Sequence, residues 1–189
     1  IFPVSCLCKG ALCGILIKKQ ESGKQAMYAK VTSLGVTGLA GYIVQVEADL
    51  SGGLPQFNLV GLPDSAVKES SERVRSAIKN LNCPWPASHV TVNLAPADVR
   101  KEGSGYDLPL AIGMLASLGR LPSDKLGRYV FVGELGLDGS VRPVKGALSI
   151  AIKAREQGFE ALFVPKENER EAAVVNKLKV YGVESLLQV

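Results

Sequence analysis

The residues best suited to chemistry lie in one glycine-rich loop, Arg100-Lys101-Glu102-Gly103-Ser104-Gly105-Tyr106-Asp107. Such a loop, when it runs into a helix start, exposes backbone amides that can hold an anion or an oxyanion. Ser104 is a candidate nucleophile and Lys145 a candidate base, which is the serine–lysine variant of hydrolytic catalysis. In the structural alternative, Glu102, Gly103 and Gly105 form a turn and Asp107 caps the following helix. These residues alone favour the structural interpretation.

Nucleotide and metal motifs are missing from the chain. A phosphate-binding loop requires GxxxxGK followed by Ser or Thr, but the only Gly-Lys pair, Gly23-Lys24, is followed by Gln25. The dinucleotide fingerprint GxGxxG begins at Gly103 and lacks its third glycine. One histidine, His89, and four cysteines are poor material for a metal site, so we expect no metal ligands.

The formal net charge of +4 suggests an anionic partner such as nucleic acid. Three of those charges lie in residues 1–26, where four lysines face one glutamate, so the remainder is nearly neutral. Glutamates are interspersed among its basic residues, and aromatic residues do not alternate with them as in single-strand stacking sites. The candidates for contact with DNA or a partner are Lys68, Arg73, Arg75, Arg100 and Lys101.

Residues 1–26 differ from the rest of the chain. They hold three of the four cysteines and show neither a helical nor a strand period. Their lysines mostly follow the apolar run, whereas those of a signal peptide precede it. Lys9, Gly10 and Gly14 interrupt that run, and a membrane span needs about 20 apolar residues. We expect a non-native or disordered leader over 1–26 and one domain over 27–189.

Short strand and helix patterns alternate along this domain and must position the loop. Apolar alternation predicts strands over 42–50, 57–62, 89–94, 129–135, 141–143, 161–164 and 179–181. The first two flank a Gly-Gly-Leu-Pro turn, so we expect a hairpin or close neighbours. Helical periodicity predicts helices over 64–81, 107–118, 144–157 and 167–177. The expected fold class is α/β, with a mixed sheet and packed helices.

Three stretches resemble the bacterial YifB/ComM family of magnesium-chelatase-like AAA+ ATPases. They are GLPDSAVKESSERVRSAIKN at 61–80, TVNLAPADVRKEGSGYDLPLAIGML at 91–115 and VGELGLDGSVRPVKGAL at 132–148. The resemblance runs from Met27 to the C-terminus and covers only the N-terminal domain of that family, ahead of its AAA+ module. It implies the fold of Lon proteolytic domains, of the RadA C-terminal domain and of the second domain of a small-subunit ribosomal protein.

The resemblance also bears on the serine–lysine hypothesis. Against a Lon-type loop of the form DGPSAG, Gly105 takes the position of the nucleophile and Ser104 lies one position early. In the Lon pattern PxGGLK the lysine follows the proline by five residues, and the fifth residue after Pro143 is Leu148. The resemblance therefore implies a proteolytically silent domain, with a hydrolase using Ser104 and Lys145 as the alternative.

For the whole protein, the resemblance implies a cytoplasmic hexameric helicase that promotes DNA branch migration during natural transformation. ATP and magnesium would bind to the AAA+ module, outside this chain. For this domain it implies a non-catalytic role, assembling the ring with its own AAA+ module and engaging DNA, without a membrane. An RNA-binding module is a further alternative, by analogy of fold alone.

Overall fold

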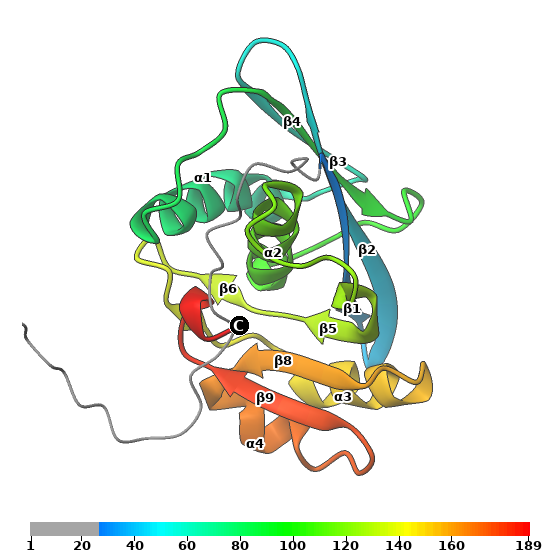
Figure 1. Ribbon diagram of the computed structural model, residues 1–189. Helices are drawn as coiled ribbons and strands as arrows, with labels where there is room; N and C mark the ends of the chain where they lie inside the picture. The colour runs from blue at the N-terminus through cyan, green and yellow to red at the C-terminus, as the bar shows by residue number, and fades with distance from the viewer. Residues whose placement is uncertain (1–26) are drawn as a thin grey trace, which may run out of the picture.

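The computed structural model describes residues 27–189, and the predicted leader lies outside the described residues. Within this part of the chain, seven strands form a mixed sheet in the order β3-β4-β2-β1-β5-β8-β9 (Figure 1). Their bounds are β1 (Tyr28–Thr37), β2 (Ala40–Ser51), β3 (Gln56–Val60), β4 (His89–Ala95), β5 (Tyr129–Phe131), β8 (Ala161–Pro165) and β9 (Lys179–Val183). A separate two-stranded ribbon pairs β6 (Glu134–Leu135) with β7 (Val141–Arg142). The expected mixed α/β fold class is confirmed.

Two pairs of helices cover the two faces of the sheet (Figure 1). On one face, α2 (Asp107–Ser117) packs against β1 and β2, and α1 (Ser65–Asn80) packs against α2. On the other face lie α3 (Ala147–Glu156) and α4 (Glu169–Ala172). Strand β8 shows this division. Phe163 packs against the hydrophobic cluster that includes α1 and α2, while Leu162 and Val164 belong to the cluster that includes α3 and α4.

The central strand β1 was not among the predicted strands. It pairs with β2 in antiparallel register and with β5 in parallel register, and α2 and α3 cover its two faces. Its buried residues therefore include polar ones, and the hydroxyl of Ser33 donates to the carbonyl of Phe131 at 2.9 Å. This burial on both faces replaces the apolar–polar alternation that marks a half-exposed strand.

The strands predicted over 42–50 and 57–62, which correspond to β2 and β3, are paired only partly as expected. Strand β4 lies between them, antiparallel to β2 and parallel to β3. The two are therefore close neighbours that run in opposite directions, as in a hairpin, but they share no ladder of hydrogen bonds.

Three predicted elements are shorter than expected. The strand over 129–135 is interrupted after Phe131, where the amide of Gly133 donates to the carbonyl of Gly105 at 2.9 Å. Helix α3 begins late, since the side chain of Asn168 bonds both backbone groups of Val144 at 2.9 Å. The helix expected over 167–177 reduces to α4, and Lys177 has a left-handed φ of 65°.

Candidate functional site

Ser104 and Lys145 line the same cleft, which has a volume of about 580 Å³. Ser104 opens a short 3-10 turn (Ser104–Tyr106) ahead of α2, and Lys145 is exposed on the segment between β7 and α3. The Ser104 hydroxyl donates to the carboxylate of Glu134, whose other oxygen lies 3.6 Å from Nη1 of Arg142. The serine thus donates to a carboxylate, whereas the serine–lysine dyad requires the amine of Lys145 as the acceptor of its proton.

The two positions that match the Lon dyad carry no group able to transfer a proton. At Gly105, an added Cβ would lie 3.6 Å from methyl groups of Val132 and Val144, so the backbone has room for a side chain that the sequence does not supply. Leu148 lies in the first turn of α3 with an exposed aliphatic side chain, and its amide donates to Glu171 at 3.0 Å. The geometry therefore does not favour Lon-type hydrolysis.

Two tyrosines support the loop ahead of α2. The hydroxyls of Tyr42 and Tyr106 lie 3.1 Å apart, and that of Tyr42 also donates to the carbonyl of Arg100 at 3.2 Å. Burial, and after it the hydrogen bond with Tyr42, raises the pKa of Tyr106 far above its ordinary value. Gly35 lies directly against this pair, where a Cβ would clash with the Tyr106 hydroxyl and the Tyr42 ring.

Asp107 is the most fully bonded side chain of the predicted site. Its carboxylate is buried and accepts hydrogen bonds from the Ser70 hydroxyl, from Nε of Arg73 at 2.6 Å and Nη2 at 3.1 Å, and from the amide of Leu135 at 3.1 Å. It is the first residue of α2 and does not cap it, which corrects the expected capping role. Its negative charge suits the helix N-terminus, and its hydrogen bonds join α2 to α1 and β6.

Lys101 points into the protein. Its side chain is buried, and Nζ donates to the carbonyls of Pro96 and Val99, the second at 2.7 Å. Its backbone also pairs with the turn ahead of α1, since its amide donates to Leu62 at 3.1 Å and its carbonyl accepts from Asp64 at 3.0 Å. Burial lowers the pKa of Lys101.

Burial and pairing therefore remove two residues from the expected contact surface. Lys101 and Arg73 hold the loop and α1 in place, and neither is free to contact DNA as predicted. The other three candidates are exposed. Arg100 lies 3.5 Å from Glu102, Arg75 lies 6.0 Å from the ring centre of Trp85, and Lys68 is on the outer face of α1.

The remaining residues of the loop fix its shape. Gly103 has a φ of 84°, and its amide donates at 3.1 Å to Asp64, whose other oxygen caps α1 through Val67 at 2.7 Å. Glu102 is exposed. The backbone of the loop is thus tied to the start of α1, which supports the structural interpretation of this motif.

Sequence reasoning missed Glu134 and Tyr42, which hold the loop from distant positions. Glu134 lies 30 residues from Ser104, and Tyr42 lies 64 residues from Tyr106. One signal was present for Glu134, because it is the acid in an otherwise apolar pattern, YVFVGEL. No comparable local signal marks Tyr42.

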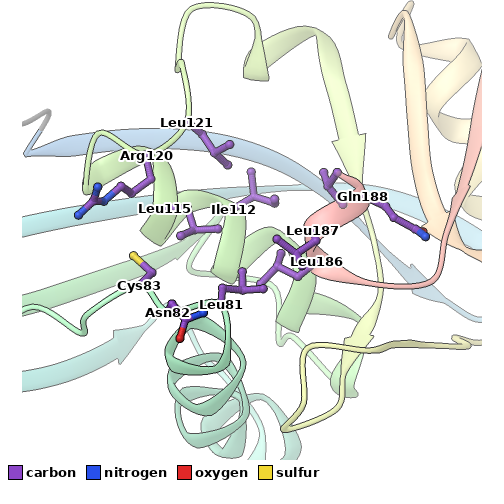
Figure 2. A pocket seen from close by; sticks show the side chains of 11 residues that line it. Leu81, Asn82, Cys83, Ile112, Leu115, Arg120, Leu121, Leu186, Leu187 and Gln188 are labelled. Atoms are coloured by element: carbon purple, nitrogen blue, oxygen red, sulfur yellow. The ribbon is translucent and has the colours of Figure 1, made fainter. Parts of the chain in front are cut away.

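A smaller apolar hollow, of about 150 Å³, lies where the ends of α1 and α2 meet the last residues of the chain (Figure 2). Leucines and an isoleucine dominate its lining, which includes Leu81, Ile112, Leu115, Leu121, Leu186 and Leu187. Leu187 is 66% exposed, so the apolar lining extends to the surface.

Neither a metal cluster nor a membrane span is found in residues 27–189. This part of the chain holds no group of three or more His, Cys, Asp or Glu side chains arranged to bind a metal ion. None of its helices has the length and apolar character that crossing a bilayer requires.

The sequence that forms the central part of this fold and its loop matches a known family. The family model described as subunit ChlI of Mg-chelatase matches residues 46–168, which is more than half of the chain. The chain therefore belongs to this Mg-chelatase-like family, as the resemblance of its motifs indicated.

The chain is also similar along much of its length to individual members of the YifB/ComM group. The chain is 48% identical to YifB of Escherichia coli over 133 residues, 70% of this chain and 26% of that protein. It is 44% identical to the competence protein ComM of Haemophilus influenzae over 161 residues, 85% of this chain and 31% of ComM. The chain thus spans about a third or less of the length of these relatives.

The expected likeness to Lon is also found. The chain is 26% identical to the Lon protease of Methanosarcina barkeri over 186 residues, 92% of this chain and 23% of the protease. This similarity agrees with the mixed sheet and packed helices described above.

Proposed function

We propose that residues 27–189 form a non-catalytic assembly and DNA-engagement domain of a Mg-chelatase-like AAA+ ATPase. The observation that carries the non-catalytic part is the bonding of Ser104, whose hydroxyl donates to Glu134 and not to an amine. Gly105 and Leu148, at the positions matched to the Lon dyad, add no proton-transfer group. In this proposal the cleft lined by Ser104 and Lys145 carries out no Lon-type chemistry.

Likeness to the competence protein ComM supports a role of the whole protein in DNA metabolism. We propose a cytoplasmic hexameric helicase that promotes branch migration in natural transformation. ATP and magnesium belong, in this proposal, to the part of the relatives' length that this chain does not span. Residues 27–189 contain no GxxxxGK sequence, so they do not fit a Walker-type nucleotide site.

The assembly role is assigned to the apolar hollow at the ends of α1 and α2 (Figure 2). Its occupant in this proposal is the protein's own AAA+ module, because the relatives are about three times as long as the matched region. A Leu187→Asp variant of the full-length protein then forms fewer hexamers in sedimentation experiments. A Leu39→Asp variant is the control, since Leu39 is 91% exposed and does not line the hollow.

DNA contact is assigned to the exposed candidates Lys68, Arg75 and Arg100. Replacing all three by Ala weakens binding of labelled DNA and reduces the slope of log affinity against log salt, by about 0.7–0.9 for each phosphate that the protein no longer neutralises. Fluorescence anisotropy over a salt series measures both quantities. An Arg155→Ala variant, on the exposed side of α3, serves as the control. An unchanged slope in the triple variant contradicts the assignment.

A further inference from the structure

Aromatic residues that are far apart in the sequence form a stack across three parallel strands. Strands β5, β8 and β9 lie side by side (Figure 1), and their register aligns Phe131, Phe163 and Tyr181. The Phe131 and Phe163 rings are stacked at 4.9 Å between centroids, and the Phe163 and Tyr181 rings at 5.1 Å. The stack of three rings thus extends across the strands, from the interior of the sheet toward its edge.

The stack ends on an exposed ring. Phe131 is buried, Phe163 is half-buried and Tyr181 is 46% exposed. Strand β9 is the last strand of the sheet on this side within residues 27–189. Helices α3 and α4, which contact β8 and β9, lie on the other face. Within residues 27–189, Tyr181 is therefore the last ring of the stack, and its exposed surface lies at the edge of the sheet.

Two lysines lie beside this ring. Lys179 precedes Tyr181 by two residues on β9, so the two side chains share a face of the strand about 7 Å apart. Lys177 and Lys179 are exposed, and neither forms an ion pair within residues 27–189. A shallow hollow next to them also includes Glu160, whose carboxylate is bound by Arg128 at 3.1 Å. The local charge that is free to meet a ligand is positive.

We propose that this edge of the sheet binds single-stranded DNA, with a base stacked on Tyr181 and the flanking phosphates held by Lys179 and Lys177. The inference rests on the proposed function that the domain engages DNA, and it names a surface for it. In a single strand the face of a base is accessible, whereas in a duplex it is covered by stacking on the neighbouring base pairs. A site that stacks on a base therefore selects the single strand. Every base has a π face, so we expect little sequence preference.

The chain offers a matched control on another strand. Tyr28 and Lys30 lie two residues apart on β1, and Tyr28 is 52% exposed. Their neighbours differ, because the register places Asp49 opposite Tyr28 and Glu47 opposite Lys30. Tyr28 and Lys30 thus have the same residue types and spacing as Tyr181 and Lys179 on β9. Their neighbours are acidic residues, whereas Tyr181 has the aromatic stack beside it.

The test is fluorescence anisotropy of labelled oligothymidylate with the chain and its variants. Tyr181→Ala weakens binding about 5- to 150-fold, the range expected for loss of one base–aromatic stack, and Tyr181→Phe retains it. Lys179→Gln weakens binding and reduces the salt slope, whereas Tyr28→Ala and Lys30→Gln bind as the unaltered chain does. An abasic oligonucleotide of equal length binds the unaltered chain about as weakly as oligothymidylate binds Tyr181→Ala.

The outcomes separate this inference from the function on which it rests. Equal binding by Tyr181→Ala and the unaltered chain, or equal binding of abasic and base-containing strands, overturns the stacking site and leaves DNA engagement in place. No binding of either oligonucleotide by the unaltered chain overturns both. The abasic oligonucleotide is measured on the unaltered chain, so it shows whether a loss in Tyr181→Ala comes from stacking or from damage to the fold, and Tyr181→Phe shows whether the ring suffices without its hydroxyl.

Discussion

The region around Asp107 and the edge of the sheet at β9 use their side chains in opposite ways. Around Asp107, polar groups from α1, α2 and β6 meet inside the protein, and within residues 27–189 no buried side-chain nitrogen or oxygen lacks a hydrogen-bond partner. At β9, the aromatic stack ends on the open face of Tyr181 beside Lys179, which forms no ion pair in that part of the chain. The polar groups of the first region bond to one another, whereas the exposed groups of the second are available to a ligand.

This difference shows why a polar motif is a poor guide to an open site. The loop sequence of Arg100 to Asp107 carries the residues that would attract attention as a catalytic or DNA-binding motif. A buried polar group is costly without a partner, so the fold uses Lys101 and Asp107 for its own hydrogen bonds. The β9 edge carries no motif, yet within residues 27–189 Lys177 and Lys179 form no ion pair, and Tyr181 is 46% exposed.

The largest expected effect comes from breaking the Asp107 cluster. An Asp107→Asn variant removes the closer of the two carboxylates that pair with the Arg73 guanidinium, which is only 19% exposed, and leaves the 72% exposed Glu69 at 3.6 Å. We expect a loss of about 3 kcal/mol in the free energy of unfolding, typical of a buried pair that loses one partner. Urea denaturation measures it.

The control for this variant is Glu102→Gln, which removes the acid of an exposed pair with Arg100, both side chains being 70% exposed. Such pairs contribute about 0–1 kcal/mol, so the control should change stability little. Equal stability losses in the two variants would show that the Asp107 cluster does not hold the fold.

An intermediate effect is expected at Gly35. A Gly35→Ala variant places a methyl group against the Tyr42 and Tyr106 hydroxyls and forces the pair apart. Overpacking of this kind costs about 1–3 kcal/mol. Thermal unfolding followed by circular dichroism measures the loss, and a melting temperature equal to that of the unaltered chain would mean that the tyrosines move without cost.

The smallest effect is expected at Gly105, the matched test of the same substitution. An added Cβ meets only ordinary contacts at 3.6 Å, so Gly105→Ala should change stability by about 0.5 kcal/mol or less. The same unfolding measurement applies. A loss as large as that of Gly35→Ala would show that the cleft wall is as tightly packed as the tyrosine pair.

Local periodicity predicted much of the fold. Helix α1 and strand β4 lie within a residue of their predicted ranges, since each has one buried side and one side that is less buried. Strand β1 was missed because burial on both faces removes that alternation. The helix expected over 167–177 was too long, because the left-handed backbone of Lys177 and an exposed Val174 do not continue a packed helix.

The site was predicted less well, for a physical reason. Ser104 and Lys145, chosen by residue type, line one cleft, but partners of the loop residues come from elsewhere in the chain. Glu134 accepts the hydrogen bond of the Ser104 hydroxyl, and Asp107 pairs with Arg73, which lies 34 residues away in the sequence. The aromatic stack was equally hidden, because only the register of three parallel strands brings Phe163 and Tyr181 together.

We propose above all that this domain engages DNA through its exposed surface while the Ser104 cleft serves the fold. Titration of the ¹⁵N-labelled chain with oligothymidylate, followed by amide chemical shifts, tests it most directly. We predict shifts along β9 around Lys179 and Tyr181 and at Arg100, with the amides of Gly105 and Lys145 unchanged. Shifts confined to Gly105 and Lys145, with β9 unaffected, would contradict the account.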